Sequence, residues 1–139
     1  MEIKFRAFVK HLGQLADVLS IDFLDSEVEI YLVDRDEIRK YRFGEDEIVL
    51  LPFTGLKDKN GREIYEGDIL ELGIQKGILK SVVEYHSPTF CHRWINLEEA
   101  GIRGKKIEPL FWNTNIIFEV IGNVYENPEL LEGTECMGK

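Results

Sequence analysis

The chain has few cysteines that could form disulfides and no long apolar run that could span a membrane. It has only two cysteines, Cys91 and Cys136, far apart in the sequence, which is no disulfide framework. The longest apolar run, 48–53, already contains Pro52 and falls well short of the roughly 18 residues that suggest a membrane-spanning helix. The first residues alternate charged and apolar side chains, so we expect no signal peptide. These scarcities exclude disulfide-rich secreted domains and helical membrane proteins, and they favour a reduced, cytoplasmic protein.

Basic residues are scarce as well. Lys and Arg number 17 against 26 Asp and Glu, a formal net charge of −9. Residues 1–50 hold 7 basic and 12 acidic side chains, residues 51–110 hold 9 of each, and residues 111–139 hold 1 and 5. Proteins that bind nucleic acid gain affinity from a basic face that releases counterions. We therefore expect no nucleic-acid binding, and the same sign of charge disfavours binding to acidic membranes.

One local group of cations runs against this charge balance. Lys57, Lys59 and Arg62 lie close together in the sequence, with Lys76 and Lys80 further along. We interpret them first as solvated turn residues, which is the usual role of such charges. The other interpretation, a phosphate-binding patch, requires that they share a face with an aromatic side chain.

Short alternating stretches predict a chain built mainly of strands. In the segment 28–32, Val28, Ile30 and Leu32 alternate with Glu27, Glu29 and Tyr31, which is typical of a half-buried strand. Period two, or an apolar run bounded by turn residues, predicts further strands at 3–9, 19–23, 48–51, 69–72, 78–85, 90–97 and 116–121. We expect the strand at 48–51 to be buried on both faces.

Helix is expected at few places. The end of the chain favours a helix at 127–132, with Asn127 as its cap and Pro128 at its first position. A short helix is considered at 14–19, and a loop or single helical turn at 34–40.

These elements predict a mainly β (α+β) fold in a single domain of two lobes. Residues 1–51 form an N-terminal β-rich lobe. Residues 52–133 form a small barrel-like or SH3-like β lobe with a short C-terminal helix, and residues 134–139 a frayed tail. Pro52 and the turn that follows it place the boundary near 51–54.

The stretch TGLKDKNGREIYEGDIL at 54–70 is the most informative in the chain. Asn60-Gly61 is a strong turn signal, since both residues accept a positive φ angle. Ile64 is expected to pack inward and Tyr65 outward. Gly67 and Asp68 are expected to make a tight turn into the next strand. We interpret the motif as structural, through Gly55, Asn60, Gly61, Tyr65, Gly67 and Asp68.

The residues that carry chemistry do not combine into a reactive pattern. His86, Cys91 and His92 are the most natural metal ligands, yet strand alternation puts Cys91 and His92 on opposite faces. The sequence has no nucleophile elbow, phosphate-binding loop or dinucleotide fingerprint. We therefore predict a protein that is not an enzyme, with no catalytic residue, no cofactor and no metal.

Aromatic residues offer the remaining candidate surface. Trp94, Phe111 and Trp112 could together stack unpaired bases or receive a partner's side chain. The competing interpretation places Trp94 in the core and uses Phe111-Trp112 to anchor the chain. The candidate interaction surface comprises Lys57, Lys59, Arg62, Trp94 and Trp112.

Three stretches of the sequence resemble the YopX family, small proteins encoded by bacteriophages, prophages and integrated elements of bacteria. Residues 54–70 resemble its hallmark, and IKFRAF at 3–8 resembles its start, where tryptophan often replaces Phe8. FEVIGNVYENPELL at 118–131 resembles its ending, whereas 102–115 gives nothing to align. The resemblance implies a phage-associated protein, cytoplasmic in an infected or lysogenic bacterium. It carries over no catalytic residues.

Two functions of different classes follow, with an enzyme of unknown type as a weaker third. The first is a non-enzymatic interaction module that binds an unidentified host or phage protein, motivated by the acidic N-terminal lobe. The alternative is a barrel that binds single-stranded nucleic acid. Convergence of the lysines on one face beside Trp94 or Trp112 distinguishes the two. Homo-oligomer formation is left open by both.

Overall fold

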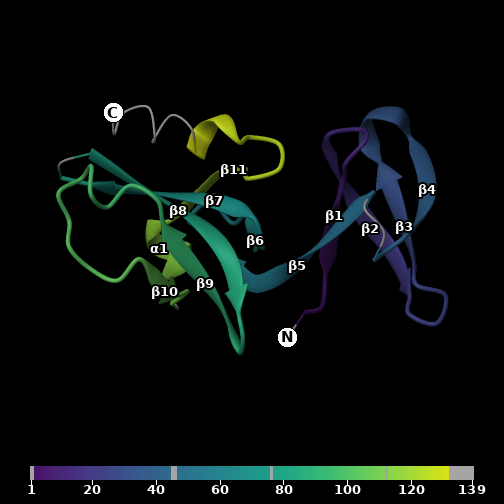
Figure 1. Ribbon diagram of the computed structural model, residues 1–139, viewed down its shortest axis with the longest axis horizontal. Coiled ribbons are helices and arrows are strands. Elements are labelled where there is room, and N and C mark those ends of the chain that lie inside the picture. Colours follow the sequence, from purple (N-terminus) through teal and green to yellow (C-terminus); the bar gives the residue numbers. More distant parts are fainter. Residues whose placement is uncertain (1, 45–46, 76, 112, 132–139) are drawn as a thin grey trace. The chain divides into compact units, whose positions relative to one another are not determined.

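The computed structural model describes residues 2–44, 47–75, 77–111 and 113–131 (Figure 1). The chain divides into two compact units, Met1–Phe53 and Thr54–Lys139, and strands are the main elements of each. Helical structure in the described ranges is limited to short segments, so the prediction of a mainly β fold is confirmed. None of the described helices is long and apolar enough to cross a membrane.

The first unit is an antiparallel meander. Its elements are β1 (Phe5–Val9), β2 (Gln14–Asp22), β3 (Glu27–Leu32), the 3-10 turn η1 (Val33–Arg35), β4 (Glu37–Arg42) and the first part of β5 (Ile48–Lys57). The strands follow the order β4-β3-β2-β1-β5. Alternate side chains of β1 and β3 supply most of the core, which comprises Ala7, Val9, Ala16, Val28, Ile30, Leu32 and Ile48. The alternation predicted for 28–32 is thus confirmed.

The short helix considered at 14–19 is wrong, because this segment is the first part of β2. β2 is hydrogen-bonded on both sides, to β1 and to β3, and Ala16 lies opposite Ala7 in the core. A helix this short is marginal by itself, whereas β1 pairs with residues 14–17 and β3 with the residues from Asp17 onwards.

The charged stretch 34–40, expected as a loop or one helical turn, is shared between η1 and β4. Asp36, with a left-handed φ of 48°, ends η1, and β4 then pairs with β3 as the edge strand. An edge strand tolerates charge on both faces, so it lacks the alternation that reveals a strand in sequence. In β5, Val49 and Leu50 are only half-buried, so the strand at 48–51 is more exposed than predicted.

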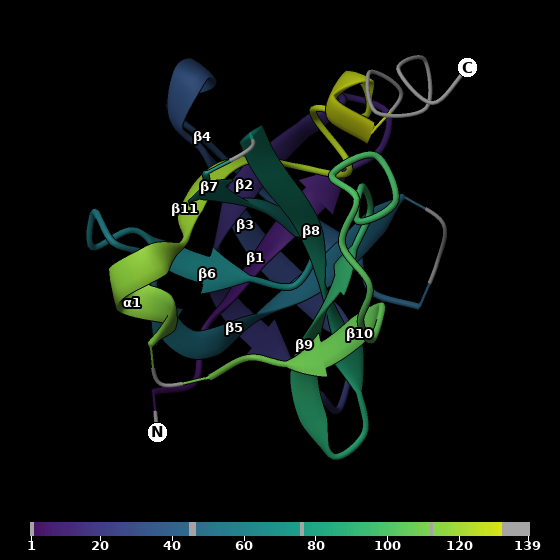
Figure 2. The same ribbon diagram turned by 90° about the vertical axis from the view of Figure 1, so that its left-hand side faces the viewer.

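The second unit is built around a five-stranded antiparallel sheet. Its strands are β7 (Asp68–Ile74), β8 (Gly77–His86), β9 (Thr89–Trp94), β10 (Ile107–Pro109) and β11 (Glu119–Asn123), in the order β10-β9-β8-β7-β11. Figure 2 shows β8 between β7 and β9. The end of β5 pairs with β6 (Glu63–Tyr65), and α1 (Thr114–Ile117) precedes β11. The core comprises Ile64, Leu70, Leu79, Val83, Trp94, Phe118 and Val120.

The strand expected at 116–121 begins as helix α1 and becomes a strand only at Glu119. The N–H groups of Ile116 and Ile117 donate back to the carbonyl of Asn113 at 2.9 and 3.3 Å, which closes a helical turn. Over so short an apolar run, residue type does not distinguish a helical turn from a strand.

The C-terminal helix is helical at 129–131, and its predicted end at Glu132 and the tail 134–139 lie outside the described residues. The carbonyl of Asn127 accepts a hydrogen bond from the N–H of Leu130 at 3.1 Å, which places Asn127 at the start of the helix, and capping by its side chain stays a prediction. Its Oδ1 accepts a hydrogen bond from the N–H of Asn123 at 3.2 Å, so it fixes the turn before the helix. The barrel-like or SH3-like form of the second unit stays a prediction.

Candidate functional site

Asp58 is the central side chain of the hallmark stretch. Its carboxylate is buried, and Oδ1 accepts hydrogen bonds from the N–H groups of Asn60 and Arg62, both at 2.9 Å. Oδ2 accepts a third from the N–H of Val120, also at 2.9 Å. Burial raises the pKa of Asp58, but these backbone donors outweigh it and leave the pKa below its ordinary value. A carboxylate held in this way stabilises structure and is not poised to exchange a proton.

The turn at Asn60-Gly61 is present, and only Gly61 uses its freedom to adopt a positive φ, at 80°. The N–H of Asp58 donates to the carbonyl of Arg62 at 2.8 Å, and that of Gly61 to the carbonyl of Asp58 at 3.0 Å. This is a three-residue hairpin loop closed by a left-handed glycine. Gly55, in β5, also has a positive φ and lies exposed.

The second turn of the hallmark also matches its prediction. Gly67 has a φ of 89°, and a Cβ there would lie 2.9 Å from Cε2 of Tyr125. The buried Asp68 accepts a hydrogen bond from the N–H of Tyr65 at 2.8 Å. Ile64 is fully buried and Tyr65 is half-buried, as the inward and outward assignment predicts. Every motif residue named from the sequence therefore has a structural role or an ordinary exposed position.

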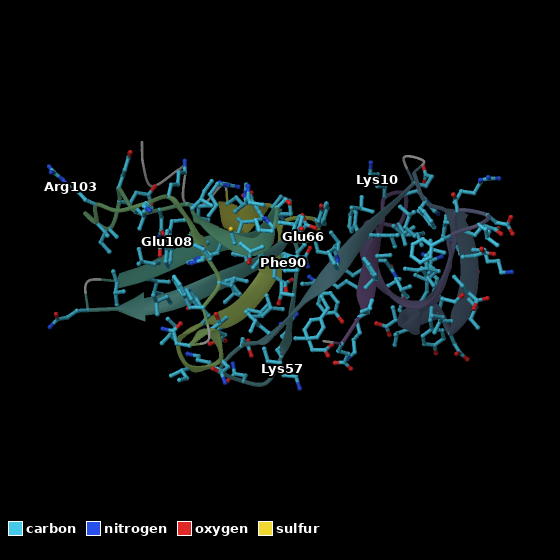
Figure 3. All side chains as sticks on the ribbon, turned by 90° about the horizontal axis from the view of Figure 1, so that it is seen from below. Lys10, Lys57, Glu66, Phe90, Arg103 and Glu108 are labelled. Carbon is cyan, nitrogen blue, oxygen red and sulfur yellow. The ribbon has the colours of Figure 1, made fainter. Side chains whose placement is uncertain are left out.

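The three cations of the candidate surface lie at the β5–β6 hairpin. Lys57, Lys59 and Arg62 are exposed there, and Figure 3 shows Lys57 projecting from this part of the chain. Lys59 Nζ lies 3.5 Å from the carboxylate of Glu119, so part of its charge is already compensated. Lys80 is half-buried in β8, and Lys76 lies outside the described residues.

The candidate aromatics are not an exposed platform where the structure describes them. Trp94 is only 8% exposed and packs in the core against His92 and Phe118, with ring centroids 4.6 and 5.9 Å away. Phe111 is about half exposed, and Trp112 lies outside the described residues. Trp94 is therefore not part of an exposed platform on which a base could stack.

His92 is a buried side chain with a structural neighbour. Its ring meets those of Trp94 and Phe118 edge-on, with centroids 4.6 and 5.3 Å away, and its Nδ1 lies 3.1 Å from Oγ of Ser81. Burial lowers the pKa of His92. A neutral imidazole in this place completes the core.

The three residues considered as metal ligands are not brought together. Cys91 and His92 lie on opposite faces of β9, and the exposed His86 places Nε2 at 2.9 Å from a carboxylate oxygen of Glu84. Among the described residues, the group with metal-ligand spacing is instead Asp22, Asp25 and Glu27, whose ligand atoms lie within 4.8 Å of one another. These residues flank the turn between β2 and β3.

That turn presents two of the three most exposed large apolar side chains among the described residues. Leu24 is 97% exposed and Phe23 is 76% exposed. Oδ1 of Asp22 accepts hydrogen bonds from the N–H groups of Leu24 and Asp25, at 3.0 and 3.2 Å, which fixes the backbone. The ring of Phe23 meets that of Phe43 edge-on, with centroids 6.1 Å apart. The turn thus holds an apolar pair in water between carboxylates, and we call it the Phe23-Leu24 turn.

Sequence reasoning missed the Phe23-Leu24 turn because it placed Phe23 on one strand face with Leu19 and Ile21. A register shift between Val18 and Ser20 breaks that face, and β2 ends at Asp22. The available signal was two large apolar residues directly before the turn residues Asp25-Ser26.

Two antiparallel, strand-built units, with buried polar groups that hold their turns, define a small β-rich protein. A family model described as YopX protein matches residues 4–132, so the chain belongs to the YopX family. The resemblance seen in three stretches is thereby confirmed over nearly the whole chain. The crystal structure of protein EF1440 from Enterococcus faecalis is similar, with 27% sequence identity and a TM-score of 0.63. The similarity covers 94% of this chain and 99% of that chain. No curated protein sequence matches.

Proposed function

We propose that this protein is a non-enzymatic interaction module that binds a host or phage protein. It is encoded by a phage or prophage and acts in the cytoplasm of the bacterial host. The Phe23-Leu24 turn carries the proposal. Large apolar side chains held in water at a fixed turn are typical of protein-binding anchors, which bury them in a pocket of the partner.

The charge around the turn defines the partner's chemistry. Asp22, Asp25 and Glu27 flank the apolar pair, and residues 1–53 carry 7 basic and 12 acidic side chains. A partner with an apolar recess and a basic rim complements this surface, and opposite potentials speed the encounter.

The buried polar side chains support the view that the module is not an enzyme, because they are engaged in hydrogen bonds within the fold. Asp58, Asp68 and Asn123 accept hydrogen bonds from backbone N–H groups, and His92 contacts Ser81. Catalytic acids and bases are instead aimed at a cleft with a pKa matched to proton transfer. These groups stabilise turns and strand ends.

Lys57, Lys59 and Arg62 on one hairpin favour the second candidate, a binder of single-stranded nucleic acid. Two observations weigh against it: the ion pair of Lys59 with Glu119, and the burial of Trp94. A net charge of −9 adds long-range repulsion of a polyanion.

Affinity capture from the bacterial host, with and without phage genes expressed, tests the proposed function. The bait is the full chain, compared with a Phe23→Ser/Leu24→Ser variant. Ile38→Ser, an exposed apolar residue on β4, is the matched control. We expect one partner held by the wild type and the control and lost by the turn variant. Absence of a specific partner under both conditions overturns the proposal.

A further inference from the structure

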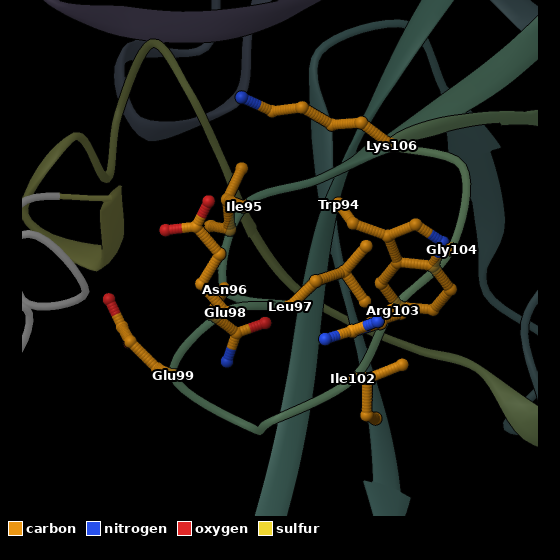
Figure 4. Close-up of a pocket in the computed structure, with 10 residues that line it drawn as sticks. All are labelled: Trp94, Ile95, Asn96, Leu97, Glu98, Glu99, Ile102, Arg103, Gly104 and Lys106. Atoms are coloured by element: carbon orange, nitrogen blue, oxygen red, sulfur yellow. The ribbon is translucent and has the colours of Figure 1, made fainter.

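A pocket in the second unit lies beneath the loop that joins β9 to β10. Its volume is about 700 Å³, and Trp94, Leu97 and Ile102 give it an apolar lining (Figure 4). Ligand pockets commonly have volumes of about 300–1,000 Å³. The space therefore takes one large side chain together with part of the backbone that carries it.

The loop around the pocket is held in shape by its own hydrogen bonds. The N–H of Ile102 donates to the carbonyl of Leu97 at 3.0 Å. The Asn96 side chain ties the loop to β8, donating to the carbonyl of Ile78 at 2.8 Å and accepting from the N–H of Lys80 at 2.9 Å. A ligand thus meets a preformed site and pays little ordering entropy on binding.

Trp94 brings a polar group to this lining. Its side chain is more than nine-tenths buried and lines the pocket, and its indole N–H bonds to no other residue that the structure describes but is open to solvent. Figure 4 shows the ring nitrogen turned towards the part of the loop that carries Gly104. An indole N–H at the wall of a pocket donates to water when no ligand is bound, and a ligand that displaces this water has to offer an acceptor. A carbonyl oxygen of a ligand supplies one.

The rim of the pocket carries charges of both signs. In Figure 4 the carboxylates of Glu98 and Glu99 lie on one side and the guanidinium of Arg103 on the other, whereas the amine of Lys106 extends towards the side of the glutamates. None of the four forms an ion pair with another described residue. The glutamates and Arg103 complement a ligand that bears a cation and an anion on either side of an apolar group.

The pocket adjoins an open strand edge, which points to a peptide. Lys106 directly precedes β10, the last strand of its sheet among the described residues. The carbonyl of Lys106 and the N–H of Leu110 bond to β9, so the N–H and C=O of Ile107 face away from it. An extended segment can pair there, and Pro109, which has no N–H, limits the pairing to a short stretch.

We propose that this pocket and the β10 edge bind a short extended segment of a partner protein. An apolar side chain of the segment packs beside Trp94, with an acidic residue facing Arg103 and a basic residue facing Glu98. This inference rests on the proposed function, since it adds a second surface by which the module holds a partner.

Two synthetic peptides test the site, Gly-Lys-Thr-Leu-Thr-Glu-Gly and its charge-reversed order Gly-Glu-Thr-Leu-Thr-Lys-Gly, both acetylated and amidated. In an extended peptide, the two charges and the leucine point to the same side. The full chain carries Trp112→Phe, so Trp94 is the only tryptophan and its fluorescence reports binding. We expect a saturable change with one order, lost when glycine replaces the peptide's leucine.

Charge exchange then tests the rim. Arg103→Glu should weaken the bound peptide about threefold or more, and a peptide with lysine in place of its glutamate should recover the loss. Lys57→Glu is the matched control, because Lys57 and Arg103 lie at separate places on the second unit (Figure 3). Arg103 is exposed, so its replacement does not disturb the core.

The inference is overturned if neither order gives saturable binding, or if Lys57→Glu weakens binding as much as Arg103→Glu. Lack of recovery with the exchanged peptide overturns the assignment of Arg103. If the peptides fail while the intact chain still captures a partner through the Phe23-Leu24 turn, this site is wrong and the proposed function stands. If both fail, both are wrong.

Discussion

The Oδ2 atom of Asp58 accepts a hydrogen bond from the N–H of Val120 at 2.9 Å, which joins the hallmark hairpin to β11. Beside it, the N–H of Lys59 donates to the carbonyl of Phe118 at 2.9 Å. Because the other carboxylate oxygen holds the hairpin loop, one buried side chain fixes both the turn and the position of β11. The hallmark of the family is in this reading a clamp for the fold.

Replacement of Asp58 by alanine should therefore be strongly destabilising. Three backbone donors lose a charged acceptor in a buried place, so we expect the free energy of unfolding to fall by about 2–4 kcal/mol. Urea denaturation measures the loss. Glu99→Ala, which removes an exposed carboxylate from the same unit, should change it by less than about 0.5 kcal/mol. Equal shifts for the two variants contradict the clamp.

Stability should decrease on mild acidification because of His92. Burial lowers its pKa in the folded chain, so the unfolded chain takes up a proton first. The neutral ring contributes fully to the free energy of unfolding above the pKa of histidine in the unfolded chain, near 6.5. This contribution is lost as the pH falls through the pKa of His92 in the folded chain.

Thermal or urea unfolding between pH 7.5 and 5 measures this effect. Uptake of one proton changes the free energy of unfolding by at most about 1.4 kcal/mol per pH unit. His92→Gln should remove this dependence on pH. His86→Gln, at an exposed histidine, is the control. An unchanged slope in His92→Gln shows that another group is responsible.

Gly67 should resist substitution. A Cβ there meets the ring of Tyr125 at 2.9 Å, and the φ of 89° disfavours any L side chain, so Gly67→Ala should cost more than about 1 kcal/mol. Gly73, in β7, has open space around it and no positive φ. Gly73→Ala and Glu66→Ala should both be nearly neutral. Equal and small shifts in the denaturation midpoint for all three variants would contradict a strained, closely packed turn at Gly67.

We expect no sequence-independent binding to single- or double-stranded DNA at ~0.15 M salt, where charges beyond roughly 8 Å are screened. The chain carries a net charge of −9, and phosphate binding that rests on a few surface cations weakens steeply with salt. Fluorescence anisotropy with labelled oligonucleotides measures it. A micromolar dissociation constant, lost in a folded Lys57→Ala/Lys59→Ala/Arg62→Ala variant, promotes the second candidate function.

The parts of the fold that the sequence predicts are those with a local signal. Val28, Ile30 and Leu32 alternate because β3 has one buried face, and Gly67 marks a backbone shape that few residues adopt. β4 escapes prediction because an edge strand needs no apolar face. The segment 14–19 is decided by pairing with two neighbouring strands. Tertiary pairing outweighs local preference in both places.

The sites were less predictable than the fold because they depend on distant partners. The sequence predicts the turn at Asn60-Gly61, but the contact of Asp58 with Val120 spans 62 positions. Trp94 is named as a candidate, whereas the loop that forms a pocket over it is rich in charged residues and glycines, which do not predict a pocket. The exposure of Leu24 follows from where β2 ends, which a register shift determines.

Photo-crosslinking from position 24 in living cells tests the central claim most directly. A photoreactive amino acid replaces Leu24 in one strain and Ile38 in another, in bacteria that carry the phage genes. The account predicts one discrete adduct with a partner protein from position 24 and none of that mass from position 38. Absence of an adduct from position 24, or the same adduct from both positions, contradicts it.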